Sequence, residues 1–374
     1  MKIVVTALVL NLLAGSVWAQ YTLAIDNPEV KQLITQNLEY LYNTNVAESK
    51  KLNQRIRQLL PNHPANPLLE ALTVRAAHHP IEPESPEMDQ LKDYLYQTVE
   101  TAEAILDEDE DNPEATFFMM AGYGLLSLYE NESGNYMKAV GLARDAYSSL
   151  KAGMEMKEDF AEFYFSTGLY NYYRVKYPEM HPIYKPFMWF FKSGDKALGL
   201  EQVKKAYRES IFMEAESADY LAHIYLHYED DAQQGLKYAR ILTEKYPNNA
   251  YFATNFLDAA LAVGNYQNLE SPIRRLLNNP RPYYRMGGHL FQGMLLEKRD
   301  KDFTTAERQY IKSLEVGTSL KSEQAEHYRS HAYAGLARIA HQRQKYTQAR
   351  QLYERALASA QYDIVRNEAE AYLD

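Results

Sequence analysis

His223 and His227 are four residues apart, the spacing at which two imidazoles on one helix face can bind a zinc ion. The residue after His223 is Ile224, not the glutamate that serves a zinc protease as general base, and no third ligand is evident. We therefore expect these histidines to pack between helices. We expect no metal ion and no other cofactor.

Other patterns that could support chemistry are incomplete. The acidic run at residues 107–111 lacks the alternating ligands and the central glycine of a calcium loop, so we expect a solvated turn. The sequence has no GxSxG motif, no phosphate-binding glycine loop and no cysteine nucleophile. These absences predict a protein that is not an enzyme.

An aromatic segment is the best candidate for binding. Residues 177–191 combine three prolines with tyrosine, phenylalanine and tryptophan, so we expect a regular helix to stop before Phe187. In one interpretation the segment folds back and covers an exposed face of the protein. In the other it forms a lid or pocket wall. The candidate partner-binding residues are then Tyr172, Tyr173, Tyr184 and Trp189.

The elements that position these residues follow a repeat. A small residue or leucine recurs at intervals of 34 to 43 residues, where two helices of a helix-turn-helix unit would need close contact. The positions are Gly199, Gly235, Leu269, Ala306 and Ala349.

The last repeat is the clearest. Apolar residues at helical spacing run from Tyr333 to Ala340, and a second set runs from Tyr346 to Ala356 after a turn at Gln344-Lys345. This pattern resembles the tetratricopeptide (TPR) repeat, although Ala337 stands where the usual glycine would be and the closing proline is missing.

The whole chain is predicted to be all-α, a TPR-type α-solenoid of about eight helix-turn-helix repeats. Asn27-Pro28-Glu29 is a good start for the first helix, because it places a capping side chain before a proline and an acid. A short capping helix is expected at residues 363–373. One unit is stretched, since Ala139 and Gly199 are 60 residues apart, and we assign the excess to an insert at residues 177–195.

The N-terminus predicts export. Lys2 precedes a short apolar run, and Val17-Trp18-Ala19 has the small-residue spacing of a signal-peptidase site. We expect residues 1–19 to be a signal peptide and residues 20–374 to be a single solenoid. Without cysteine the protein cannot be a lipoprotein of the diacylated type, so we expect it in the periplasm or secreted, with no integral membrane segment after cleavage.

The net charge of the chain argues against nucleic acid as a partner. The chain has 40 lysines and arginines against 50 aspartates and glutamates, a net charge of −10. A net acidic chain is a poor binder of nucleic acid, because phosphate groups require a basic surface. The 32 tyrosines suit packing between repeats, and some could face a ligand.

Two motifs add a family resemblance. The stretch FFKSGDKALGL at residues 190–200, with GLYNYY at residues 168–173, is similar to exported TPR proteins of Bacteroidetes type, and more weakly to the eukaryotic inclusion-body-clearance TPR family. The resemblance supports the fold and the compartment, and it provides no catalytic residue.

The sequence therefore predicts a non-enzymatic periplasmic scaffold or adaptor that binds a protein or peptide partner in the cell envelope. A solenoid that binds a glycan or small molecule is one alternative. An enzyme whose site is assembled across repeats is another, and titratable side chains converging in a closed pocket would favour it.

Overall fold

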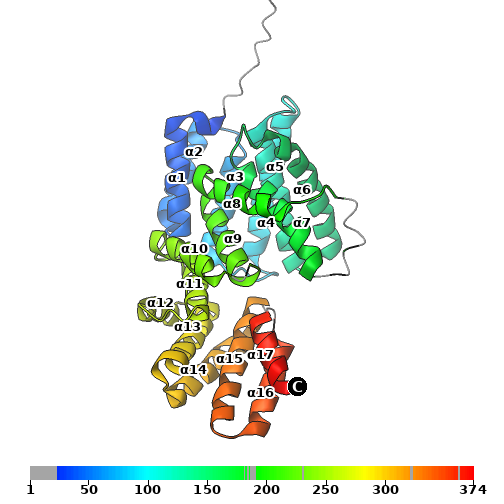
Figure 1. Ribbon diagram of the computed structural model, residues 1–374. Helices are drawn as coiled ribbons and strands as arrows, with labels where there is room; N and C mark the ends of the chain where they lie inside the picture. The colour runs from blue at the N-terminus through cyan, green and yellow to red at the C-terminus, as the bar shows by residue number, and fades with distance from the viewer. Residues whose placement is uncertain are drawn as a thin grey trace, which may run out of the picture.

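A computed structural model describes residues 23–180, 182, 185, 191–229, 231–320, 323–360 and 363–374. Within these ranges all regular secondary structure is helical, and no strand is present. In the described part of the chain the helices form eight consecutive pairs followed by a single last helix, as the repeat pattern predicts (Figure 1). None of the helices in these ranges is both long and apolar enough to cross a membrane.

The eight pairs follow one another along the chain, and the two helices of each pair pack together. They are α1 (Pro28–Tyr42) and α2 (Val46–Leu59), α3 (Ala65–His78) and α4 (Pro86–Leu106), α5 (Pro113–Glu132) and α6 (Tyr136–Met156), α7 (Phe163–Met180) and α8 (Lys196–Glu209), α9 (Glu214–His227) and α10 (Ala232–Lys245), α11 (Ala250–Ala262) and α12 (Glu270–Leu277), α13 (Pro282–Leu295) and α14 (Phe303–Val316), α15 (Glu323–Gln342) and α16 (Tyr346–Ala358), with α17 (Asp363–Leu373) as the last helix.

The recurring small residues are confirmed as contacts between paired helices. A Cβ atom on Gly199 would lie 2.6 Å from the backbone nitrogen of Tyr172, so α8 and α7 touch backbone to backbone. A Cβ atom on Gly235 would lie 3.0 Å from the carbonyl oxygen of Ala222 in the next pair. Ala306 and Ala349 are fully buried at the matching positions of their helices. The residues that recur with the repeat period therefore lie where two paired helices leave least room for a side chain.

The first helix and the last helix begin at the predicted residues. The Asn27 side chain accepts hydrogen bonds from the backbone N–H groups of Glu29 and Val30, which caps α1. At the other end α17 buries Val365 and Ala369 against α15 and α16. Helix α17 thereby covers an apolar face of the pair formed by α15 and α16.

The stretched unit differs from the prediction in one respect. Helix α7 continues to Met180, so the first residues assigned to the insert belong to this helix. Pro178 lies inside its last turn and is buried. A proline there removes one backbone hydrogen bond and does not have to end a helix that packing supports. The second helix of the unit begins at Lys196, as expected, with the Asp195 side chain as its cap.

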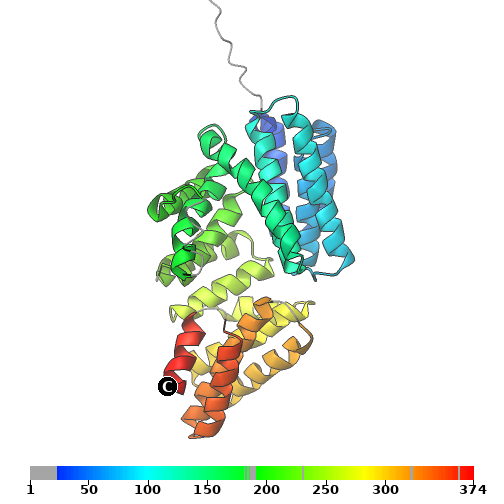
Figure 2. The same cartoon turned by 90° about the vertical axis from the view of Figure 1, so that its right-hand side faces the viewer.

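The repeats do not form an open arc, because the first two pack against the fifth to seventh. In Figures 1 and 2 the helices α1 to α5 lie opposite α7 to α10, and the repeats from α11 onward continue below them. The Tyr42 ring, at the end of α1, stacks on Phe252 of α11 and contacts Tyr246 after α10. The Tyr42 carbonyl accepts a hydrogen bond from the Asn249 side chain at 2.9 Å.

The end of α3 makes a second closing contact. The Arg281 side chain donates a hydrogen bond to the carbonyl oxygen of Ala77. His79 Nδ1 lies 2.8 Å from the Tyr284 hydroxyl, and the His79 ring packs edge-on against Tyr251. These contacts hold one turn of the superhelix closed and enclose a central space.

Candidate functional site

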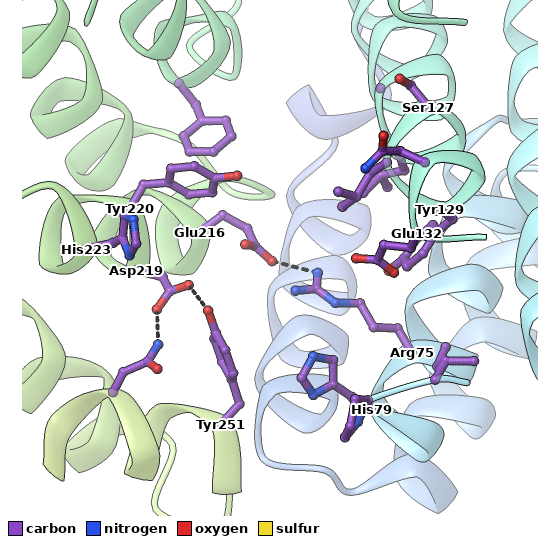
Figure 3. Close-up of a pocket in the computed structure, with 18 of the residues that line it drawn as sticks. Arg75, His79, Ser127, Tyr129, Glu132, Glu216, Asp219, Tyr220, His223 and Tyr251 are labelled. Atoms are coloured by element: carbon purple, nitrogen blue, oxygen red, sulfur yellow. Dashed lines mark hydrogen bonds and ion pairs between the residues drawn. The ribbon is translucent and has the colours of Figure 1, made fainter. Parts of the chain in front are cut away.

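The closed turn surrounds a cavity of about 1610 Å³. Two walls face each other across it in Figure 3: α3 and α5 on one side, and α9 and α11 on the other. Helix α15 contributes His327 and Tyr328. The cavity is thus built mainly from the first helices of the repeats, whose inner faces meet around the superhelix axis.

An ion pair spans the cavity between the two walls. Arg75 Nη1 of α3 lies 2.9 Å from Glu216 Oε1 of α9, and Glu216 also accepts a hydrogen bond from the Tyr42 hydroxyl at 3.2 Å (Figure 3). The attraction of Glu216 raises the pKa of Arg75 well above its ordinary value. Burial raises the pKa of Tyr129, which lies beside Arg75. Arg75 therefore stays charged, and its charge is balanced from the opposite wall.

A second acid lies one helical turn beyond Glu216. Asp219 accepts hydrogen bonds from the Tyr251 hydroxyl at 2.9 Å and from the Asn255 side-chain amide at 2.8 Å. Burial and the nearby charge of Glu216 raise the pKa of Asp219 to about 7, although these two hydrogen bonds oppose the rise. This carboxyl group can therefore change its charge near neutral pH.

Histidines gather where α9, α11 and α15 meet. His223 and His227 have ring centroids 4.6 Å apart on α9, and His327 and His331 repeat that spacing on α15. Asp258 of α11 lies between them, with one carboxylate oxygen 3.7 Å from His327 Nε2. His223 lines the cavity wall, whereas its spacing predicts a position packed between helices.

Burial determines the charge of the histidines in this cluster. Desolvation lowers the pKa of His223 and of His331 to about 3, so both imidazoles are neutral at physiological pH. Burial alone would raise the pKa of Asp258, but contact with His327 and the nearby imidazoles hold it below its ordinary value. The Asp258 carboxylate thus lies beside His327 and near the uncharged imidazoles of His223 and His331.

Exposed apolar side chains also gather in the cavity. Leu128, Tyr136, Tyr177 and Tyr220 are 48%, 65%, 41% and 36% exposed, and all four line it. Large apolar groups exposed inside a concavity are typical of binding sites, since they gain most from contact with a partner.

The four predicted binding residues have different positions. Tyr172 is fully buried and its hydroxyl donates to Glu229 Oε1 at 2.5 Å, so its ring belongs to the packed interior. Tyr173 is half-buried, lines the cavity and packs edge-on against Tyr172 and Tyr228. Tyr184 and Trp189 lie outside the described residues.

Sequence reasoning missed most of the polar cavity wall. Arg75, Glu216 and Asp219 stand in no recognisable motif, because the pairing that matters joins repeats distant in sequence. Only the histidine group could have been recognised from the sequence. His327 and His331 have the same four-residue spacing as His223 and His227, so two histidine pairs on inner helices were visible in the sequence.

Comparison with known proteins gives structural likenesses only. No protein-family model matches the sequence, and a search of curated proteins also found no match. Among solved structures, yeast Tom70 is 10% identical, with 90% of this chain and 88% of that chain covered, at a TM-score of 0.37. The C-terminal part of a TPR repeat-containing protein from Cytophaga hutchinsonii is 11% identical over 91% and 99%, at a TM-score of 0.33.

A third structure is the human IFIT1 dimer with PPP-AAAA, which is 14% identical over 90% of this chain and 96% of that chain, at a TM-score of 0.38. At these TM-scores the superhelix of this chain does not superpose closely on any of the three.

Proposed function

We propose that this chain is a non-enzymatic TPR-type scaffold that binds a segment of a protein or peptide partner inside the closed turn of its superhelix. The observation that carries the proposal is the gathering of exposed apolar side chains within a cavity that also presents paired charges. An extended peptide offers both kinds of group, because apolar side chains alternate with polar backbone along its length.

The cavity chemistry supports a peptide more than a nucleic acid. Its acids include Glu216, Asp219 and Asp258, while Arg75 is already paired with Glu216. A phosphate backbone would meet repulsion here, in keeping with the net charge of −10. A peptide with cationic or amide groups flanking an apolar side chain would be attracted.

We also propose that the protein is exported to the periplasm. The signal-peptide pattern at residues 1–19 and the resemblance to exported Bacteroidetes-type TPR proteins support a periplasmic site of action in the cell envelope. N-terminal sequencing of the protein recovered from a periplasmic extract should give Gln20 as the first residue. An unprocessed Met1 terminus in the cytoplasmic fraction would contradict export without affecting the binding proposal.

Binding inside the cavity can be tested by filling part of it with a large side chain. A Cβ atom on Gly124 of α5 would meet nothing within 4 Å, and Gly124 lines the cavity. Gly124→Trp should therefore fill part of the space without disturbing the fold. Gly141→Trp is the matched control, because Gly141 also has open space around its Cβ position but lies on α6 away from the cavity lining.

The readout is recovery of partners from an envelope extract, identified by mass spectrometry. We expect Gly141→Trp to recover the wild-type set of proteins and Gly124→Trp to lose it. Equal recovery by both variants would place binding outside the cavity. Recovery of glycans in place of peptides would favour the carbohydrate-binding alternative, in which the tyrosine rings stack on sugars.

One observation favours an enzyme as a second candidate. Titratable side chains of three repeats converge in this cavity, among them Asp219, Asp258 and His327. Against catalysis, Asp219 and Asp258 are each held by a neighbouring side chain. Chromogenic ester, phosphate and glycoside substrates should be hydrolysed no faster with the protein than in buffer. A rate above buffer that Asp219→Asn or His327→Asn abolishes would establish the enzyme instead.

A further inference from the structure

Two side chains of the cavity wall, Asp258 and His327, form a compact set of metal-ligating groups together with His331. Asp258 of α11 and His327 and His331 of α15 each offer one ligand atom, and these atoms lie within 4.8 Å of one another. The two histidines are one helical turn apart, and their ring centroids are separated by 4.6 Å. Two helices from different repeats thus present the three groups to one point.

The donor set suits a transition metal. Zinc prefers imidazole nitrogen and carboxylate oxygen at about 2.0–2.2 Å, and two histidines with one acid is a set found at catalytic and binding zinc sites. Tetrahedral coordination places neighbouring ligand atoms about 3.4 Å apart. The separation of 3.7 Å between Asp258 and His327 is already close to that value. The His331 ligand atom lies within 4.8 Å of the other two, so it would have to come closer to both when the ion binds.

The surroundings are compatible with a dication. Arg338, about two turns beyond His331 on α15, is neutralised by Glu297 at 2.6 Å and by Glu368 at 2.8 Å. The second histidine pair, His223 and His227 on α9, lies near enough to Asp258 to interact with its charge. The site is therefore rich in nitrogen donors, and the nearest guanidinium is balanced by two carboxylates, while the Lys298 ammonium is also near enough to act on Asp258 and His331.

We propose that Asp258, His327 and His331 bind one Zn²⁺ ion, with its remaining coordination position directed into the cavity. Asp258 and His327 both line the cavity, so that position is accessible from it. The ion would join α11 to α15 and give the acidic wall a local positive charge able to hold an anionic group.

The test uses the purified full chain, prepared without a polyhistidine tag and stripped of metal with a chelator. Titration with Co²⁺ should give visible absorption bands of tetrahedral intensity that saturate at one ion per chain. Zn²⁺ should then remove these bands by displacing cobalt. Asp258→Asn and His331→Asn should each weaken binding by about 100-fold or more, since each removes a direct ligand.

His341→Asn is the matched control. His341 lies on the same helix, but its ring contacts Tyr346 and Tyr372, away from the proposed site. It should leave the cobalt spectrum and the zinc affinity unchanged. Circular dichroism checks that each variant is folded, and the wild-type titration decides the question even where a variant unfolds. The proposal is overturned if the wild-type chain shows no one-to-one binding, or if the folded Asp258→Asn and His331→Asn variants bind as tightly as the wild type.

Discussion

Arg75 Nη1 and Glu216 Oε1 are 2.9 Å apart, and this ion pair joins the second repeat to the fifth across the central cavity. Their side chains are 31% and 19% exposed, so the pair is partly shielded from solvent. Repeat proteins normally contact only their nearest neighbours along the chain. Here a bond between distant repeats turns a linear array into a closed one, and it should couple the unfolding of its two halves.

We expect Arg75→Ala to lower the free energy of unfolding by roughly 1–3 kcal/mol, because Glu216 would keep a partly buried charge without its main partner. Urea unfolding followed by circular dichroism measures the change. Arg55→Ala is the control, since Arg55 pairs with Glu29 where both side chains are more than half exposed, and its loss should cost less than about 0.5 kcal/mol. Equal effects of the two variants would show that the pair does not hold the turn closed.

The second prediction concerns pH. The pKa of Asp219 is raised to about 7 in the folded chain from an ordinary value of 3.8, chiefly by burial. Between these values the folded state binds a proton that the unfolded state does not, so the stability due to this group is complete below about pH 4 and is lost as the pH rises through 7. Asp219→Asn should therefore match the wild type only near pH 4, and its advantage over the wild type should grow by on the order of 2 kcal/mol between pH 5 and pH 8.

Melting temperatures of both proteins between pH 5 and 8 test this expectation. Asp93→Asn removes the same charge from an exposed position on α4, and its difference from the wild type should not change with pH. If Asp219→Asn were less stable than the wild type at every pH, the hydrogen bonds from Tyr251 and Asn255 would outweigh the cost of burying the carboxylate.

The third prediction tests the repeat contact. A methyl group on Gly199 would lie 2.6 Å from the backbone nitrogen of Tyr172 and 2.7 Å from the carbonyl oxygen of Gly168. Because backbone atoms cannot move aside as a side chain can, Gly199→Ala should destabilise the protein by about 1–3 kcal/mol. Gly141→Ala, also within a helix but with open space around it, should be neutral or stabilise by up to about 1 kcal/mol. Urea unfolding should separate the two variants, and a neutral Gly199→Ala would disprove the close contact.

The sequence was most informative where structure is local. The contacts at Gly199 and Gly235 recur because each pair of helices must cross closely, and this leaves a period that can be counted. Helix caps such as Asn27 depend only on neighbouring residues and were equally predictable. The length of α7 was not, because Pro178 normally argues against helix and only its buried packing shows otherwise.

The site could not be predicted in the same way. Whether Arg75 meets Glu216 depends on the summed twist of the intervening repeats, and a small change in each would leave them far apart. The histidine pairs were visible as spacings, but Asp258 joins His327 only through the packing of α11, α13 and α15. Tyrosines were chosen as candidates by type, and the sequence does not show that Tyr172 faces inward while Tyr173 faces the cavity.

The last prediction separates those two neighbouring tyrosines. The Tyr172 hydroxyl donates to Glu229 at 2.5 Å, and Glu229 also pairs with Lys196 at 3.1 Å. Tyr172→Phe keeps the buried ring and removes one hydrogen bond to a charged group, so it should cost about 1–3 kcal/mol of stability and leave partner recovery unchanged. Tyr173→Ala changes the cavity wall and should reduce partner recovery while the chain remains folded. Thermal unfolding and pull-down from an envelope extract measure the two effects. A loss of binding in folded Tyr172→Phe, or full binding by Tyr173→Ala, would reverse the roles that burial assigns to these residues.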